Sequence, residues 1–329
     1  MVTIKEVARK AGVSTATVSY VLNDARRVRP ETQKRVLLAA RRLGYTPNKA
    51  ARSLAAGRSS TLGLVVPDIG NPFFPEIIRA FQESANLSGL EAVVMDTAYD
   101  AQRTRGVIER LVSLQVPGAA FFTTQVDSGI KEALAARNIA AVYMDYGDAA
   151  HGISSIAVNY RQGMLEAIAH LRDLGHRRIG LVGGPAHGAG AQRRKAAFLE
   201  GLKNHGLEGR AIESDFSVQG GYFSCSKLLA SYDCTAVIAA NDLMAIGALH
   251  LAYDRQIAVP AQLSIIGFDD ITFAQFTQPA LTTVAVPRAE IGRVAFESLS
   301  ALMKDPGAAG ETHEIPTHLV VRQTTAGVE

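Results

Sequence analysis

From Thr61 onward, short apolar runs alternate with longer stretches that have helical spacing. Strands that alternate with helices combine into parallel sheets with helices on both faces, so this pattern predicts an α/β body. The expected strands are Leu62–Val66, Glu91–Met95, Ala119–Phe122, Ala140–Met144, Arg178–Val182, Ala236–Ala239 and Ser264–Phe268. The expected helices between them include Glu76–Leu87, Arg103–Leu114, Tyr160–Leu174, Arg193–His205, Gly221–Ala230 and Leu243–Tyr253.

The first 58 residues differ from this body in charge. They contain 13 Lys and Arg and three Asp and Glu, so they carry +10, whereas the remaining residues carry −7 and bring the net charge to +3. A basic segment joined to a mildly acidic body is typical of a head that binds a polyanion and is carried by a domain with another role.

Three short helices are expected in this head. Apolar residues at helical spacing predict a first helix over Ile4–Lys10, Gly12 permits a tight turn, and Ser14 can cap a second helix. A third helix begins at Arg29-Pro30-Glu31 and ends at Gly44. The pattern alone leaves DNA binding and a solvated helical bundle open, and the charge of +10 favours DNA binding.

A hinge is expected after the head. Residues 47–60 contain good helix formers but only one large apolar residue, Leu54, so a helix there requires a partner to be stable. That partner is either a second copy of the chain or nucleic acid. We therefore expect a helix-turn-helix domain at 1–46, a hinge helix and linker at 47–60, and a body at 61–329.

Several classes of protein are not expected. The chain has no run of about 18 apolar residues that would span a membrane. Its N-terminus lacks the apolar region of a secretory signal, and Cys225 and Cys234 form neither a metal-binding spacing nor a disulfide framework. These features predict a cytoplasmic protein with no membrane partner, no metal and no cofactor.

The head carries motifs of a known family. The stretch Thr3–Ser19 reads TIKEVARKAGVSTATVS, and it is followed by YTPN at Tyr45–Asn48 and ARSL at Ala51–Leu54. On these motifs the chain resembles the lactose/galactose repressor (LacI/GalR) family over essentially its whole length, and it is most similar to the purine-repressor branch. The resemblance implies a nucleoid-associated transcriptional regulator that binds a double-stranded DNA operator as a homodimer, under control of a small-molecule effector.

The resemblance assigns roles to the second helix of the head. Thr15, Ala16 and Tyr20 occupy the positions that read bases in the major groove. Thr17 and Ser19 occupy positions that bind phosphate, which fixes the register without reading sequence. Ala16 has no hydrogen-bonding group, so it offers only a methyl contact or free space.

The resemblance also assigns roles to the hinge. Ala51 and Leu54 match residues that enter the minor groove, with Leu54 as an apolar wedge. Lys49 and Arg52 would flank them on the DNA backbone. The further DNA-binding residues that we expect are Thr3, Ser14, Asn23 and Asn48.

The family's body consists of two α/β lobes that are similar to periplasmic sugar-binding proteins and hold a ligand in the cleft between them. By that pattern the first lobe spans about 61–158 and 287–329, the second spans about 159–286, and the chain finishes in the first lobe. Ligands of open parallel sheets bind beyond the carboxyl ends of the strands, where this chain has polar or aromatic residues.

Four residues match ligand-binding positions of the family. Arg194 stands four residues before Phe198, Asp269 lies in the sequence GFDD, Asn241 lies in ND, and Phe216 lies in SDF. The other ligand-binding residues that we expect, all near strand ends, are Asn71, Phe73, Phe74, Asp145 and Gln192.

Several of these assignments have an alternative. Asp145 and Asn241 could cap helices, and the two phenylalanines at the first strand end could belong to the core. The basic run Arg193–Lys195 could be a solvated charge cluster. Asp269 and Asp270 could form a carboxylate pair for acid–base chemistry, although adjacent residues in a turn usually diverge.

The residue types favour a polyhydroxylated ligand, because an arginine fork, an aspartate and flat aromatic faces suit a ring with vicinal hydroxyls. Where purine repressors have an arginine and a threonine after the fifth strand, this chain has Gly188 and Gly190, while Gln192 and His187 add neutral hydrogen-bonding groups. We therefore expect a sugar or sugar derivative, with a nucleobase or nucleoside corepressor as the alternative.

Catalysis is not expected. The glycine-rich stretch Gly183–Gly190 lacks the GK[ST] sequence of a phosphate loop, and we find no hydrolase or zinc-protease motif. A solute-binding protein without a DNA role would share the two-lobe body, but the basic head argues against it. The tail Glu311–Glu329 contains no leucine heptads, so we expect a dimer rather than a tetramer.

Control is expected to pass from the cleft to the hinge. A ligand that prefers one angle between the lobes would change the spacing of the two hinge segments. Because the hinge helices order only when they pair on DNA, a small lobe movement would produce a large change in operator affinity.

Overall fold

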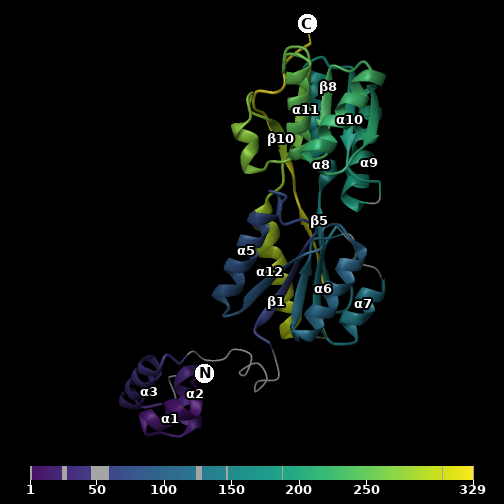
Figure 1. The fold of residues 1–329 in the computed structure, drawn as a ribbon. Helices are drawn as coiled ribbons and strands as arrows, with labels where there is room; N and C mark the ends of the chain where they lie inside the picture. Colours follow the sequence, from purple (N-terminus) through teal and green to yellow (C-terminus); the bar gives the residue numbers. More distant parts are fainter. Residues whose placement is uncertain are drawn as a thin grey trace. The chain divides into compact units, whose positions relative to one another are not determined.

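The computed structural model describes residues 2–23, 28–45, 59–123, 128–145, 147–186, 188–305 and 307–328 (Figure 1). These residues form two compact units, 1–59 and 60–329, which we call the head and the body. Each unit has its own hydrophobic core, so each is described separately.

The head consists of α1 (Ile4–Ala11), α2 (Thr15–Asn23) and α3 (Pro30–Leu43). Gly12 and Gly44 adopt left-handed conformations, with φ of 62° and 64°, and end α1 and α3 as their positions in the sequence predicted. The three helices pack on a small core that is centred on the fully buried Val7, Val18 and Val36.

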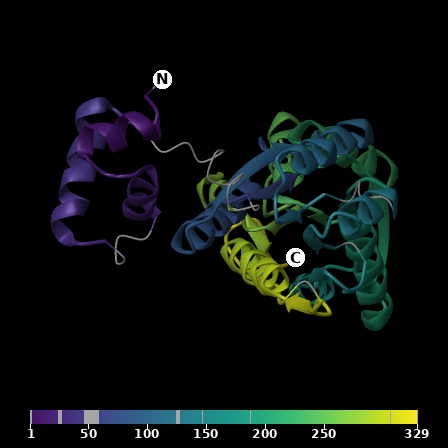
Figure 2. The same cartoon turned by 90° about the horizontal axis from the view of Figure 1, so that it is seen from below.

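The first sheet of the body has the order β11-β5-β4-β3-β1-β2, and all of its strands are parallel. Helices α5 and α12 pack together on one face, and α6 and α7 lie on the other (Figures 1 and 2). The strands are β1 (Thr61–Val66), β2 (Glu91–Asp96), β3 (Gly118–Phe121), β4 (Ala140–Met144), β5 (Ile153–Val158) and β11 (Thr312–Ile315). The helices are α5 (Phe74–Leu87), α6 (Ala101–Ser113), α7 (Ser128–Ala135) and α12 (Arg288–Lys304).

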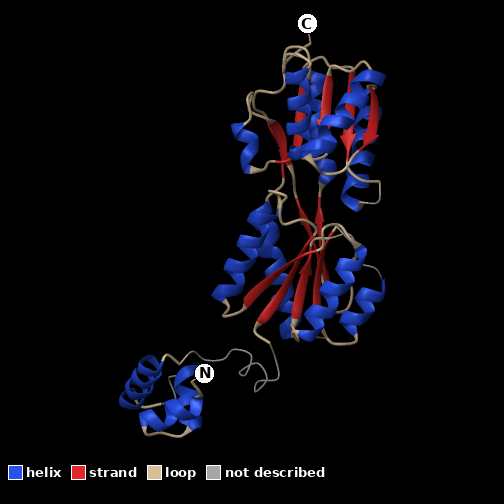
Figure 3. Cartoon of the chain, viewed as in Figure 1, coloured by secondary structure: helices blue, strands red, loops and turns tan. Residues whose placement is uncertain are grey.

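The second sheet has the order β12-β10-β9-β8-β6-β7, and only β12 is antiparallel to its neighbour. Helices α8 and α9 pack together, and so do α10 and α11, and the two pairs cover opposite faces (Figure 3). The strands are β6 (Arg178–Gly183), β7 (Glu208–Glu213), β8 (Ala236–Ala239), β9 (Ser264–Asp269), β10 (Thr282–Ala285) and β12 (His318–Val320). The helices are α8 (Tyr160–Asp173), α9 (Ala189–His205), α10 (Val218–Ser231), α11 (Asp242–Asp254) and the 3-10 helix η2 (Thr272–Phe276).

The body therefore has two lobes, and the chain crosses between them near residues 158–159, 286–287 and 316–317. The first lobe contains 60–158 and 287–316, and the second contains 159–286 and 317–328. The expectation that residues 287–329 lie in the first lobe and that the chain finishes there is wrong beyond Ile315. Strand β10 would otherwise leave an open edge, which β12 covers, and Val328 then donates to the carbonyl oxygen of Leu174 in the second lobe.

Thr317 fixes the last of these crossings. Its hydroxyl donates to the carbonyl oxygen of Asn159 at 2.7 Å and accepts from the backbone N–H of Gly163 at 3.0 Å. These bonds tie the last crossing segment to the first. Within the ranges given above, no helix is long and apolar enough to cross a bilayer.

Two glycines allow α10 and α11 to pack in direct contact. A Cβ atom at Gly221 would lie 2.3 Å from the carbonyl oxygen of Met244, and one at Gly247 would lie 2.0 Å from that of Val218. The helix backbones therefore touch, and neither position has room for a side chain.

We predict that Gly221→Ala lowers the free energy of unfolding by about 1–3 kcal/mol, because the added methyl must force the helices apart. The matched control is Gly106→Ala on the exposed face of α6, where a Cβ meets nothing within 4 Å. It should raise the free energy by about 0.5–1 kcal/mol, since alanine is the better helix former. Urea unfolding of both variants measures this, and a Gly221→Ala variant as stable as the parent would contradict the direct backbone contact.

Candidate functional site

Polar residues lie buried at the carboxyl ends of parallel strands, where the two lobes meet. Asp145 follows β4 in the first lobe, while Asn241 follows β8 and Asp269 ends β9 in the second. Together with Arg194 on α9, their exposed fractions are 5%, 2%, 5% and 6%, respectively. Four buried polar side chains at such a place require partners, and these partners define the site.

Arg194 is held between aromatic rings and a carboxylate. Its guanidinium carbon lies 4.0 Å from the centroid of the Tyr160 ring and 4.7 Å from that of Phe268. One Nη atom donates to Asp269 Oδ1 at 3.4 Å. Its Nε is buried without a hydrogen-bond partner among the described residues, so this donor is available to an acceptor on a ligand.

Asp269 has an unusual environment and an unusual backbone. Burial raises the pKa of its carboxyl to about 7, although the positive charges of Arg194 and Arg288 act in the opposite direction. Its φ of 110° lies in the region that favours glycine. Its carbonyl oxygen accepts a hydrogen bond from Arg288 of α12, which belongs to the first lobe.

Asp145 joins the two lobes. Its carboxylate accepts from the Tyr160 hydroxyl, from the backbone N–H of Val158 at 3.2 Å and from Arg193 at 3.0 Å. Burial raises the pKa of Asp145, partly offset by the hydrogen bond from Tyr160. Because Tyr160 and Arg193 belong to the second lobe, this carboxylate acts across the junction and not as a helix cap.

Asn241 caps a helix, as the structural alternative proposed. Its Oδ1 accepts from the backbone N–H of Met244 at 2.8 Å, and its Nδ2 donates to the carbonyl oxygen of Phe216 at 3.1 Å. The second bond positions the loop that carries Phe216, whose ring rests on Gly184 and lies 5.9 Å from the Arg194 guanidinium. Asn241 thus supports the aromatic residue Phe216, which we expected at a ligand-binding position.

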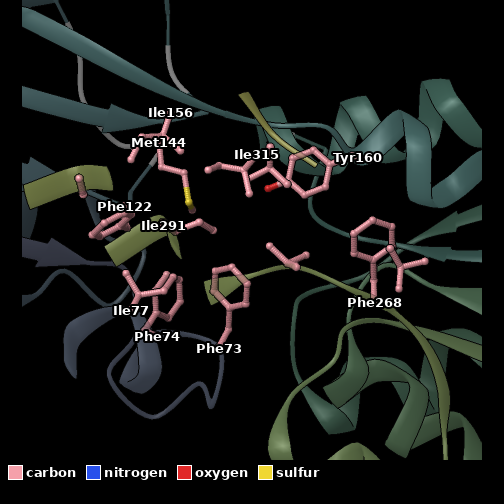
Figure 4. Close-up of a cluster of buried hydrophobic side chains, with 14 of the residues drawn as sticks. Phe73, Phe74, Ile77, Phe122, Met144, Ile156, Tyr160, Phe268, Ile291 and Ile315 are labelled. Atoms are coloured by element: carbon pink, nitrogen blue, oxygen red, sulfur yellow. The ribbon is translucent and has the colours of Figure 1, made fainter. Parts of the chain in front are cut away.

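The remaining predicted residues differ in their surroundings. Asn71 is buried and accepts from the backbone N–H of Phe73 at 3.0 Å, whereas Gln192 is exposed and donates to the carbonyl oxygen of Ala186. Phe74 packs in the core beside Ile77 and Phe122, and Phe73 lies between this group and the Tyr160 and Phe268 rings (Figure 4).

Adjacent Asp269 and Asp270 do not form a carboxylate pair. Asp269 faces Arg194, whereas Asp270 accepts from Arg322 at 2.6 Å. The nearby Asp242 is also occupied, since it accepts from the backbone N–H of Ile271 and from the Thr283 hydroxyl. The alternative of acid–base chemistry at this turn is therefore not supported.

Three residues at the junction were missed by the sequence interpretation: Tyr160, Arg193 and Arg288. Tyr160 is the first residue of α8, and Arg288 is the first residue of α12, directly after a crossing. Nothing in the sequence separates Arg193 from a solvated charge, because its partner Asp145 is 48 residues away in the chain. For Tyr160 and Arg288, only their placement directly after a crossing could have drawn attention to them.

A shallow pocket of about 270 Å³ borders the junction between α8 and α9. Arg193 and Tyr160 line it, as does the Arg161–Glu200 ion pair. The lining residues are Val158, Asn159, Tyr160, Arg161, Arg193, Ala196, Ala197 and Glu200. Its charged walls already pair within the protein, so it offers no free charge to a ligand.

On the head, α2 presents a polar face opposite its buried Val18. Thr15, Ala16 and Tyr20 are exposed, and the Tyr20 side chain is 51% exposed. Ser14 caps α2 by accepting from the backbone N–H of Thr17 at 3.1 Å. Thr3 directly precedes α1 as its N-terminal cap, where its backbone N–H and its hydroxyl donate to Glu6 and lower the pKa of that carboxyl.

The other predicted DNA-binding residues lie outside the part of the chain whose side chains the structure describes. They are Asn23, Asn48, Lys49, Ala51, Arg52 and Leu54. The basic residues that are described in the head are all exposed, so its positive charge is available to a partner. They are Lys5, Arg9, Lys10, Arg29, Lys34, Arg35, Arg41 and Arg42.

The raised pKa of Asp269 makes stability depend on pH. Because its pKa of about 7 in the folded chain exceeds the usual 3.8, the folded chain binds this proton more tightly than the unfolded chain. The contribution of Asp269 to stability is therefore largest at low pH and decreases as the pH rises to about 7. Relative to Asp269→Asn, the free energy of unfolding of the parent should fall by up to about 1.4 kcal/mol per pH unit below pH 7 and level off above it.

Urea unfolding of both proteins between pH 4.5 and 8 tests this prediction. Asp233→Asn, which removes a carboxylate that is 89% exposed, is the control for general effects of charge. If the difference in unfolding free energy between the parent and the Asp269→Asn variant stays constant below pH 7, the environment described for Asp269 is contradicted.

Comparison with known proteins agrees with this two-part architecture. Residues 3–48 match the model of bacterial regulatory proteins of the lacI family, and residues 168–325 match a periplasmic binding protein-like domain. Catabolite control protein A of Priestia megaterium is 32% identical, over 98% of this chain and 99% of that protein. The HTH-type transcriptional repressor PurR of Mannheimia succiniciproducens is 33% identical, over 98% of each chain.

A solved structure gives the same result for the whole fold. The lac repressor dimer bound to operator and the anti-inducer ONPF is 28% identical, with a TM-score of 0.88 and 99% of each chain covered. Both units of the present chain thus have counterparts, in the same order, in DNA-binding transcriptional regulators. The chain belongs to the lacI family of bacterial regulatory proteins.

Proposed function

We propose that this chain is a repressor that binds a palindromic operator as a homodimer and responds to a neutral, polyhydroxylated small molecule held between the lobes. The proposal that a ligand binds between the lobes is supported by the buried Arg194, whose Nε has no partner among the described residues. The observation that supports the DNA part is the exposed polar face of α2 on a strongly basic head.

The head supplies specificity through a few side chains and affinity through charge. Thr15, Ala16 and Tyr20 would face base edges in the major groove, while Thr17 and Ser19 would contact phosphates. In the hinge, Leu54 would enter the minor groove of the operator between Lys49 and Arg52.

A homodimer is supported by apolar side chains that stay exposed on the body. Leu87 on α5 is 92% exposed, Tyr253 on α11 is 81% exposed and Phe276 on η2 is 73% exposed. A contiguous patch of such side chains is typical of a surface that another chain covers, whereas single ones are common on any protein. The homodimer is therefore supported mainly by the lac repressor, whose matched structure is a dimer. Sedimentation of the body as a monomer at micromolar concentration would contradict this part of the proposal.

The charges at the junction favour a neutral ligand. Arg194 pairs with Asp269, Arg193 with Asp145, and Arg288 with Glu76. An anionic ligand would have to displace a carboxylate, whereas hydroxyl groups can donate to Asp269 and accept from Arg194 without leaving a charge unpaired. A sugar or sugar derivative fits this balance. A nucleobase or nucleoside, stacked between Phe73 and Phe216, is the second candidate.

The proposed role is binding and not catalysis. The neighbouring carboxylates Asp269 and Asp270 face different arginines, so they do not form the carboxylate pair that was considered for acid–base chemistry. The ligand would instead act by its preference for one arrangement of the lobes.

We predict that Tyr20→Ala weakens binding to the selected operator by about 1–3 kcal/mol while binding to random DNA changes little, because Tyr20 would contact bases and not phosphates. Leu38→Ala on α3 is the control, since Leu38 and Tyr20 are similarly exposed, at 50% and 51%. The operator comes from selection on random palindromic DNA, and fluorescence anisotropy measures affinity. Operator affinity that is unchanged for Tyr20→Ala would contradict the assigned base-reading role.

Leu54→Ala should also weaken operator binding sharply and leave ligand binding intact. For the parent, log Kd should rise linearly with log salt concentration, because phosphate contacts release counterions. DNA binding that is absent, or that is insensitive to salt, would support a solute-binding protein instead of a regulator.

We predict that one compound in a panel of sugars, polyols, nucleobases and nucleosides stabilises the parent by about 2.7 kcal/mol at 100 times its Kd. Arg194→Met should abolish this shift and leave operator binding intact, because it removes the free Nε donor. Arg293→Met is the matched control, since the partners of Arg293 among the described residues, Glu290 and Glu297, lie on its own helix. A shift that persists in Arg194→Met would remove Arg194 from the binding site.

A further inference from the structure

Arg288 is bound to both lobes at once. It is the first residue of α12 and follows the second crossing directly. Its Nε and one Nη lie 2.9 and 2.8 Å from Oε2 of Glu76 on α5, in the first lobe. Its other Nη donates to the carbonyl oxygen of Asp269, in the second lobe. The Arg288 side chain is only 10% exposed, so solvent screens these contacts little.

Asp269, which Arg288 contacts, is held by groups from both lobes. Its carboxylate faces Arg194 of its own lobe at 3.4 Å, and its carbonyl group faces Arg288 of the other lobe. Between these two groups the backbone has a φ of 110°, which a non-glycine residue holds only when its surroundings enforce it. The orientation of the carboxylate and the position of Arg288 are therefore linked through one strained residue.

We propose that Arg288 is the positioning residue that couples the conformation of Asp269 to the angle between the lobes. Glu76 anchors the guanidinium to the first lobe through two nitrogens, so a rotation of the second lobe carries the Asp269 carbonyl group away from it. A displacement of about 1.5 Å takes this N–H···O bond outside its normal range, so the contact holds in one lobe arrangement and is lost in another. The link between this contact and the response to a ligand rests on the function proposed above.

Arg288 differs from other paired arginines of the body because its partners lie in both lobes. Arg293, on the same helix, also pairs with carboxylates, but these are Glu290 and Glu297 of α12 itself. Removing Arg293 costs ion pairs within one lobe, whereas removing Arg288 releases a contact between lobes. Only the second change should alter the distribution of lobe angles.

The test measures the distance between spin labels on the two lobes of the full chain. Labels on cysteines introduced at the exposed Ser113 and Lys203 report one distance within each chain, and an excess of unlabelled chain suppresses distances between chains. The native Cys225 and Cys234 are buried, and burial raises the pKa of their thiols to about 12 and about 11, so they do not compete for the label.

We expect the parent and Arg293→Met to share one narrow distance distribution. Arg288→Met and Glu76→Gln should both add a second distance, as a minor arrangement populated on the order of 10% or less becomes substantial. Arg288→Lys keeps the charge but loses the fork, and it should give an intermediate result.

Coinciding distributions for the parent, Arg288→Met and Glu76→Gln would overturn the proposal. Should Arg288→Met fail to fold, Glu76→Gln and Arg288→Lys still decide the question. The measurement uses neither ligand nor DNA. A failed ligand panel or a failed operator selection would therefore count against the proposed function, and the measured distance distributions could still be interpreted.

Discussion

A buried guanidinium organises the junction between the two lobes. Arg194 is 6% exposed, and a charge at such a depth must be paired and surrounded by fixed groups. Its partners are the Tyr160 ring and the Asp269 carboxylate, and each of these is itself held from the other lobe. Asp145 receives the Tyr160 hydroxyl, and Arg288 donates to the Asp269 carbonyl group. One buried charge thus requires two contacts between the lobes.

This arrangement explains how a ligand too small to reach the DNA could influence it. Any molecule that satisfies the free Nε of Arg194 changes the balance at Tyr160 and Asp269, and both are linked to the first lobe. Opposite charges are matched at this junction, so the energy to shift the lobes must come from hydrogen bonds and ring contacts.

Most of the strands that were predicted correctly are buried, although the edge strand β2 was also predicted and the buried strand β10 was not. β4 and β8 are apolar along their whole length, so their sequence shows both position and bounds. Strand β7 (Glu208–Glu213) lies at a sheet edge and is largely exposed, and β11 (Thr312–Ile315) is mostly polar, so neither has an apolar run. The return of β12 to the second lobe depends on an open edge beside β10, which no local pattern reveals.

As with the strands, some site residues could be predicted from the sequence and others could not. The placement of Arg194, Asp145 and Asp269 near one another follows from their positions after parallel strands or early in a helix, which sequence can indicate. Tyr160, Arg193 and Arg288 gain their importance only from partners 15, 48 and 19 residues away, which the fold brings together. The structure also shows Asn241 as a helix cap, so a residue can match a binding position and still serve its own lobe.

The central claim is that binding between the lobes and binding to DNA are coupled. The most direct test titrates the full chain with its selected operator, in the absence and in the presence of the compound that raises its melting temperature. The account predicts that operator affinity changes by a factor of about 5–150, and that the affinity for the compound changes by the same factor when operator is bound. An operator affinity that is identical with and without the bound compound would contradict it.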